Sequence, residues 1–198
     1  MSSLMFDPRR TALVVIDLQK GIVQFPSAPH ATADVVANAG RLVVQARQAG
    51  ALIVLVHVGF SPDFADYLRP PSDEQPRMSG AMPPDWMEFV PELNQQSGDI
   101  VILKRQWGAF YGTELDLQLR RRGINTIILC GISTEIGVES TARDAFERGY
   151  EQIFAEDAMG ARTAESHVHA TTRIFPRIGR VRRTDEIVAA FGAGGSGA

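Results

Sequence analysis

The sequence predicts a three-layer α/β/α sandwich around a central, mostly parallel sheet of six strands. Short apolar runs rich in β-branched residues alternate with longer segments whose apolar residues recur at helical spacing. This alternation is typical of parallel sheets with right-handed crossovers and helices on both faces. Because 198 residues can bury one sizeable core, we expect a single domain over residues 1–191.

The amino-terminal part of the chain predicts two strands and the helix that joins them. Residues 11–17 form an aliphatic run that ends at a carboxylate, as a buried parallel strand would. The second strand is expected at residues 51–58. The helix between them ends at Gly50 and has apolar side chains at helical spacing: Val35, Val36, Ala39, Leu42, Val43, Ala46 and Ala49.

Residues 59–98 predict a long irregular excursion, with one short helix near residues 85–89. Loops of this length are usually lids or binding loops, so we expect substrate specificity to reside here. The excursion holds most of the prolines of the chain: Pro62, Pro70, Pro71, Pro76, Pro83, Pro84 and Pro91.

The remainder of the chain predicts four more strands. A strand at residues 99–103 precedes a helix at 113–122, which Thr113 can cap. The other expected elements are a strand at 125–130, a turn at 131–134, a helix to about 149, a strand at 152–155, a helix at 164–174, a strand at 180–183 and a helix from 184. Residues 192–198 are glycine-rich, and we expect a flexible tail there.

The composition excludes several classes of protein. Twenty basic and 23 acidic side chains give a net charge of −3, which leaves no basic footprint for nucleic acid or an anionic membrane. The longest strongly apolar run, residues 51–56, is far shorter than the roughly 20 residues that span a bilayer. The polar amino terminus lacks a signal peptide's apolar core, and Cys130 is the single cysteine. We expect a cytoplasmic protein that acts on a small molecule.

The residues that end the predicted strands are the first candidates for a site, because ligands of parallel sheets collect at the carboxyl ends of the strands. An acid, Asp17, and a base, Lys104, follow two of these strands. The lysine can hold the carboxylate ionised and stabilise negative charge on a substrate, while the aspartate can transfer a proton. The alternative is an ordinary ion pair.

A second candidate is the turn at residues 131–134, which leads from a strand into a helix amino terminus. Free N–H groups there favour an anion or oxyanion. The alternative is a simple turn, with Gly131 for the bend and Ser133 or Thr134 as the helix cap. Three aromatic residues after Lys104 form either a pocket wall or part of the core: Trp107, Phe110 and Tyr111.

Taken together, three segments resemble the isochorismatase-like hydrolase superfamily over nearly the whole chain. They are Val-Val-Ile-Asp-Leu-Gln around Asp17, Leu-Lys-Arg-Gln-Trp-Gly-Ala-Phe-Tyr-Gly-Thr around Lys104, and Gly131-Ile-Ser-Thr with Ser-Thr-Ala-Arg-Asp-Ala on the next helix. The resemblance implies a Rossmann-like fold, a non-proline cis peptide between Ile132 and Ser133, and a homo-oligomer. Its cysteine hydrolases use an Asp, Lys, Cys triad.

This chain departs from that triad, because Gly137 stands where the cysteine hydrolases have their nucleophile. Cys130 lies seven residues earlier in an apolar strand, where we expect a buried small side chain. Isochorismatases also have glycine at this position and form no covalent intermediate. They carry a Thr-Ala-Gln-Pro stretch after the second strand, where this chain has Val58-Gly-Phe-Ser-Pro62. The substrate remains open between a vinyl ether of the isochorismate type and a small amide.

The resulting hypothesis is a noncovalent hydrolase of a small molecule without a cofactor; the alternative is a catalytically silent relative that binds a small carboxylate or a protein partner. No metal is expected, because Asp63 and Asp66 lack nearby histidines. We expect His167 and His169 to have capping or surface roles. The catalytic residues expected are Asp17, Lys104, Ser133 and Gly137, and the substrate-binding residues are Phe25, Trp107, Phe110, Tyr111, Ile132 and Thr134.

Overall fold

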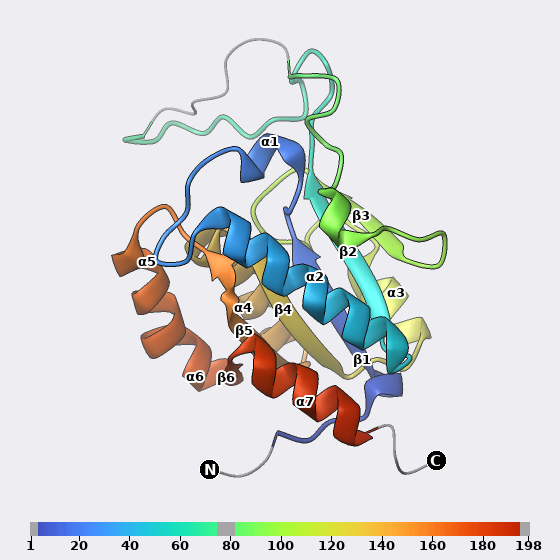
Figure 1. The fold of residues 1–198 in the computed structure, drawn as a ribbon. Coiled ribbons are helices and arrows are strands. Elements are labelled where there is room, and N and C mark those ends of the chain that lie inside the picture. The colour runs from blue at the N-terminus through green and yellow to red at the C-terminus, as the bar shows by residue number, and fades with distance from the viewer. Residues whose placement is uncertain (1–3, 75–81, 195–198) are drawn as a thin grey trace.

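The computed structural model describes residues 4–74 and 82–194 and has a six-stranded sheet at its centre (Figure 1). Its order is β3-β2-β1-β4-β5-β6, and every neighbouring pair is parallel. The strands are β1 (Thr11–Ile16), β2 (Leu52–Val58), β3 (Ile100–Lys104), β4 (Thr126–Ile132), β5 (Glu151–Gly160) and β6 (Arg180–Arg182).

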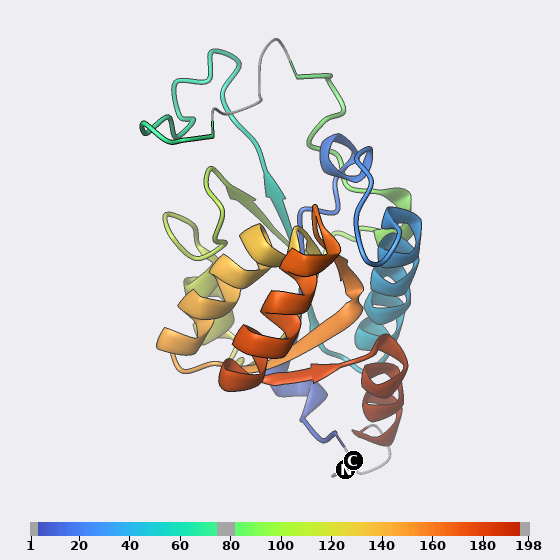
Figure 2. The same ribbon diagram turned by 90° about the vertical axis from the view of Figure 1, so that its left-hand side faces the viewer.

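Helices cover both faces of this sheet, which confirms the predicted three-layer fold (Figure 2). One face packs against α2 (Thr32–Gln48) and α7 (Thr184–Gly194). The other packs against α3 (Leu115–Arg121), α4 (Glu139–Glu147) and α6 (Phe175–Ile178). The remaining elements are α1 (Lys20–Val23), α5 (Ala164–His169), the 3-10 turns η1 (Pro8–Arg10) and η2 (Pro91–Leu93), and the π-helical turns η3 (Thr134–Val138) and η4 (Ala170–Ile174).

The central strand β1 shows why the aliphatic runs form this sheet. All six of its residues are buried. Leu13 and Val15 belong to the core beneath α2 and α7, whereas Val14 and Ile16 belong to the core beneath α3 and α4. Side chains of a strand alternate between its two faces, so a strand covered on both sides must be apolar at nearly every position. Each such side chain stabilises the fold by about 1.5–3 kcal/mol.

Three of the differences from the sequence predictions involve whole segments. The expected helix at residues 85–89 is an irregular turn. The strand β5 continues to Gly160, well past residue 155, because Glu156 and Asp157 have polar partners within the fold. The last helix, α7, runs to Gly194 and so includes the first residues of the expected tail; residues 195–198 of that tail lie outside the described residues. Within the described ranges, no helix is long and apolar enough to cross a membrane.

The strand order places the functional edge of the sheet. The chain fills one half of the sheet as β1, β2 and β3, then returns to the other side of β1 with β4. In open parallel sheets, ligands bind where the strand order reverses, beyond the carboxyl ends of the strands. Here that point lies between β1 and β4, between the residues that follow Ile16 and those that follow Ile132.

Candidate active site

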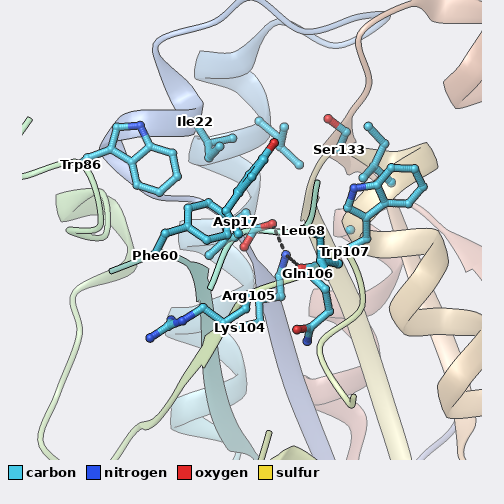
Figure 3. Close-up of a pocket in the computed structure, with 15 residues that line it drawn as sticks. Asp17, Ile22, Phe60, Leu68, Trp86, Lys104, Arg105, Gln106, Trp107 and Ser133 are labelled. Atoms are coloured by element: carbon cyan, nitrogen blue, oxygen red, sulfur yellow. Dashed lines mark hydrogen bonds and ion pairs between the residues drawn. The ribbon is translucent and has the colours of Figure 1, made fainter. Parts of the chain in front are cut away.

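A cavity of about 270 Å³ opens at this edge of the sheet (Figure 3). Its floor holds Asp17 and Lys104, and one wall is the turn after β4, including Ser133 and Gly137. The remainder of its lining is mostly apolar or aromatic: Ile22, Val58, Phe60, Tyr67, Leu68, Trp86, Arg105, Gln106, Trp107, Ile132 and Ile136. The structure thus brings the predicted acid, base and glycine together in one concave site.

The carboxylate of Asp17 is held by the backbone that follows β1. Its N–H donates to Val56 O (2.9 Å), which keeps the residue attached to the end of β2. Its φ is 54°, in the left-handed region that few residues other than glycine adopt. This conformation turns the chain out of the strand direction, and a strained backbone of this kind is common at functional sites.

The Lys104 ammonium reaches the same point from the edge strand β3. Its side chain crosses the end of β2, and Nζ donates to Asp17 Oδ2 (2.7 Å) and to Gln106 O (3.1 Å). Both members of the pair are nearly buried: Lys104 is 2% exposed and Asp17 is 6% exposed. A buried pair of opposite charges differs from a surface ion pair because little water screens it.

Burial raises the pKa of Asp17 from 3.8 to about 6, although the Lys104 ammonium acts to lower it. Asp17 Oδ1 is buried and has no hydrogen-bond partner among the described residues. The nearby Val58 N–H, which also lowers this pKa, donates its hydrogen bond to Gln19 Oε1 (2.8 Å). One carboxylate oxygen is therefore free to exchange a proton near neutral pH.

The turn after β4 lies directly above this carboxylate. The peptide bond between Ile132 and Ser133 is cis, as the family resemblance leads us to expect. Ser133 O accepts hydrogen bonds from the N–H groups of Ile136 (3.1 Å) and Val138 (3.2 Å), which closes the turn. A Cβ added to Gly137 would lie 3.2 Å from Asp17 Oδ2, so any side chain at this position would press on the acid.

No thiol reaches the cavity, because the single cysteine is in the core. Cys130 is fully buried in β4 and packs with the residues beneath α2. Burial raises the pKa of its thiol to about 12. A thiol with this pKa stays protonated at neutral pH and is not a nucleophile.

Most of the aromatic wall comes from the long excursion between β2 and β3, and Trp107 follows β3. Phe60 and Tyr67 pack edge to face with ring centroids 4.7 Å apart. Trp86 is fixed by its backbone, whose carbonyl accepts from Gly21 N (3.0 Å) and Gln19 Nε2 (3.2 Å). Sequence reasoning missed these residues, because nothing in an irregular segment predicts which side chains turn inward.

Arg105 is a second cation of the cavity that the sequence reasoning did not select. Its Nε donates to Asp66 Oδ2, and its Nη1 is buried without a hydrogen-bond partner among the described residues. The only sequence feature that could have indicated Arg105 is its position directly after Lys104. Because Arg105 is among the residues that line the cavity, its positive charge favours an anionic group on a ligand.

The expected substrate-binding residues divide into two groups. Trp107 and Ile132 line the cavity, and Phe25 lines an adjoining cavity of about 550 Å³ that shares Ile132 and Ser133 with it. Phe110 instead is 3% exposed in the core, and Tyr111 is 76% exposed at the surface.

The side chain of Thr134 is buried and turns away from the cavity to His167. The distance from Thr134 Oγ1 to His167 Nδ1 is 3.0 Å. The prediction of a capping or surface role for His167 is therefore wrong, since the side chain is buried. Within residues 4–74 and 82–194, the group of three side chains suited to a metal ion is His30, Glu156 and His167, which lies outside the cavity lining.

Comparison with known proteins identifies relatives along almost the entire chain. The Isochorismatase domain model matches residues 11–186. The uncharacterised isochorismatase family protein YwoC of Bacillus subtilis (strain 168) is 54% identical over 189 residues, which are 95% of this chain and 97% of that protein.

Two solved structures extend the comparison to the fold. An isochorismatase family protein from Burkholderia thailandensis has a TM-score of 0.91 and 42% identity, with 96% of this chain and 100% of that chain covered. The N-carbamoylsarcosine amidase from Thermoplasma acidophilum has a TM-score of 0.71 and 30% identity, with 89% and 97% covered. This chain therefore belongs to the isochorismatase family of hydrolases.

Proposed function

We propose that this protein hydrolyses a small molecule without a covalent enzyme intermediate. The observation that carries the proposal is the buried Asp17 carboxylate, whose pKa of about 6 and free Oδ1 suit it to proton transfer at neutral pH. The absence of an accessible thiol supports the noncovalent route, because Cys130 is buried and Gly137 offers no nucleophile.

Asp17 acts as the general acid or base, and the other groups of the site stabilise charge. The Lys104 ammonium, 2.7 Å from Asp17 Oδ2, keeps a positive charge at the floor of the cavity. The backbone amides of Ser133 and Gly137 bind the negative charge that develops on the substrate. Fixed donors in a site shielded from water stabilise such charge more than they would in bulk solvent.

The cavity favours a small substrate with an apolar or planar body and an anionic group. Phe60, Trp86 and Trp107 supply aromatic surface, and Arg105 supplies positive charge. Its volume of about 270 Å³ matches a small metabolite better than a polymer. Two substrate classes fit the family: a vinyl ether of the isochorismate type, and a small amide such as an N-carbamoyl amino acid.

A panel of isochorismate, N-carbamoylsarcosine and nicotinamide tests the proposal. We expect the wild-type protein to turn over one of these classes in ¹⁸O-labelled water and to place the label in the product. Intact-mass spectra during turnover are expected to show no covalent adduct. A covalent adduct that forms and decays at the rate of turnover would contradict the noncovalent route.

The Asp17→Asn variant tests the role of the carboxylate. We expect turnover to fall by about 10²–10⁴-fold, because proton transfer is lost, while the circular dichroism spectrum is unchanged. Asp34→Asn is the matched control, since Asp34 is an exposed carboxylate in the first turn of α2. Undiminished turnover by Asp17→Asn would exclude Asp17 as the catalytic acid or base.

The alternative is a silent family member that binds a small carboxylate or a protein partner without turnover. The positive charge of Arg105 at the cavity favours the carboxylate. Binding of a carboxylate analogue by the wild type, with no product from any substrate class of the panel, would favour this alternative. In either case we place the protein in the cytoplasm as a homo-oligomer.

A further inference from the structure

Three side chains that do not line the active-site cavity converge beside it, on the β5 side of the sheet. His30 lies in the segment before α2, Glu156 in β5 and His167 in α5. Glu156 Oε2 lies 3.0 Å from His30 Nε2 and 3.7 Å from His167 Nε2, and the three potential ligand atoms all lie within 4.8 Å of one another. Figure 1 shows α5 and the segment before α2 at the same end of the sheet.

The two separations to Glu156 Oε2 are close to those between ligand atoms around one metal ion. A tetrahedral zinc ion with bonds of about 2.0–2.2 Å holds its ligand atoms about 3.4 Å apart. The separations of 3.0 and 3.7 Å to Glu156 Oε2 lie on either side of that value. The longer one, to His167 Nε2, exceeds the length of a hydrogen bond.

The groups that contact these residues are placed like the hydrogen-bond partners that usually orient metal ligands. Thr134 Oγ1, 3.0 Å from His167 Nδ1, can accept its proton, and this tautomer turns the Nε2 lone pair toward Glu156. Arg183 Nη1 donates to Glu156 Oε1 (2.9 Å), which leaves Oε2 for the two imidazoles. His167 and Glu156 are therefore each oriented by a contact on the other side of the potential ligand group.

Access and rigidity are also suitable for a bound ion. The His167 side chain is 3% exposed, while those of His30 and Glu156 are 25% and 22% exposed, so an ion could enter from solvent and keep a water ligand. An antiparallel bridge between Ala28 and Ala161 holds the His30 segment against the chain that follows β5.

We propose that His30, Glu156 and His167 form a binding site for a zinc-class divalent ion, with water in the remaining position. Imidazole and carboxylate ligands in this number suit Zn²⁺ and Co²⁺, whereas Mg²⁺ prefers oxygen ligands. The ion ties the segment before α2 to β5 and α5. Through the contact between His167 and Thr134 it also supports the turn that carries Ser133.

Titration of the chelator-treated full-length protein tests the site. We expect one Zn²⁺ per chain by calorimetry, the visible absorption bands of tetrahedral Co²⁺, and no effect of Mg²⁺. At a hundredfold excess over the dissociation constant, Zn²⁺ should raise the Tm by about 5–10 °C. If Zn²⁺ gives no heat of binding and no change in Tm, the proposal is overturned. The three side chains would then form only a hydrogen-bonded cluster.

The four histidines of the chain supply matched variants. His30→Gln and Glu156→Gln should each weaken Zn²⁺ binding by more than about tenfold, while circular dichroism verifies that they fold. His57→Gln and His169→Gln should bind Zn²⁺ like the wild type. Binding that survives both cluster variants, or is lost in either control, would place the ion elsewhere. None of these readouts requires a substrate, so the outcome is independent of the hydrolase proposal.

Discussion

Two opposite charges at the floor of the cavity, Asp17 and Lys104, determine how this site responds to protons. Water is excluded from both, and the cost of burying the carboxylate exceeds the attraction of the ammonium, so the pKa of Asp17 rises to about 6. A carboxyl group with this pKa changes its protonation state within the physiological range. A surface ion pair would not, since its aspartate would stay ionised.

The activity is therefore expected to have one pH limb near 6. If Asp17 is the general base, kcat/KM rises as pH increases through this value; if it is the general acid, kcat/KM falls. The measurement is kcat/KM between pH 4 and 8 with whichever substrate the panel identifies. A profile without a limb in this range would contradict the assigned role.

The free energy of unfolding should also depend on the protonation of Asp17. The folded pKa of about 6 lies above the ordinary value of 3.8, so the folded protein holds the proton more tightly and loses stability as pH rises between these values. Asp17→Asn lacks this titration, so between pH 4 and pH 7 the free energy of unfolding of the wild type should fall relative to that of the variant by up to about 3 kcal/mol. Urea unfolding at both pH values checks this. A variant that is less stable at pH 7 than at pH 4, relative to the wild type, would reverse the sign of the shift.

Lys104→Met tests the other partner. Without the ammonium, the buried carboxylate loses its counter-charge, so its pKa should rise further and the free energy of unfolding at neutral pH should fall by about 3–5 kcal/mol. The chain's other lysine offers the control: Lys20 is exposed and pairs with Asp85 and Glu88 at the surface. Lys20→Met should change stability by less than about 1 kcal/mol. Equal effects of the two substitutions would show that burial of the pair has no energetic consequence.

At the scale of elements, the active site depends on how closely β4 and its turn approach β1. Gly131, with a φ of +121°, lies so near β1 that an added Cβ would be 2.0 Å from Ile16 O. Gly137 lies one turn further, against Ile16 and Asp17. Glycine at position 131 lets β4 approach β1 this closely, since a Cβ there would push the two strands apart, and glycine at position 137 avoids a tight contact with the carboxylate.

Alanine substitutions test separately the close contact of Gly131 with β1 and that of Gly137 with Asp17. Gly131→Ala should destabilise the fold by more than about 3 kcal/mol, whereas Gly123→Ala, at a φ of +67° in open space, should cost only about 1–2 kcal/mol. Gly137→Ala should reduce activity at least tenfold with a small change in stability, because its Cβ meets Asp17. Gly108→Ala is its control, with a nearest contact of 3.6 Å. Urea unfolding and turnover measure both effects, and a Gly131→Ala protein as stable as Gly123→Ala would contradict the close approach.

At the scale of the whole molecule, the sheet, the charged pair and the turn after β4 were predictable from sequence, but Arg105 and the part of the cavity wall between β2 and β3 were not. A fully buried parallel strand has a strong apolar signal, and the residues that end such strands must gather at one edge. The direction of Trp86 or Arg105 depends on tertiary contacts of an irregular segment. The second half of β5 was missed for a related reason: Glu156 and Asp157 are polar in sequence, and only the fold supplies His30, Arg183 and Thr184 as their partners.

The family resemblance also predicts a homo-oligomer. Large apolar side chains that remain exposed on the described surface, such as Trp107 and Phe146, are consistent with a partner that covers them. Multi-angle light scattering of the full chain should give at least twice the mass of one chain. A monomer at micromolar concentration would refute this expectation and show that one chain completes the cavity.

The charged pair and the aromatic wall of the cavity come from different parts of the chain. This separation affects how such proteins can diversify. The Asp17–Lys104 pair belongs to strand ends of the sheet, whereas most of the aromatic wall belongs to the segment between β2 and β3, whose described residues form no strand. Evolution can therefore exchange that segment and retain both the scaffold and its chemistry. Grafting residues 59–98 between two relatives should transfer preference for a substrate while the pH limb set by Asp17 stays with the recipient.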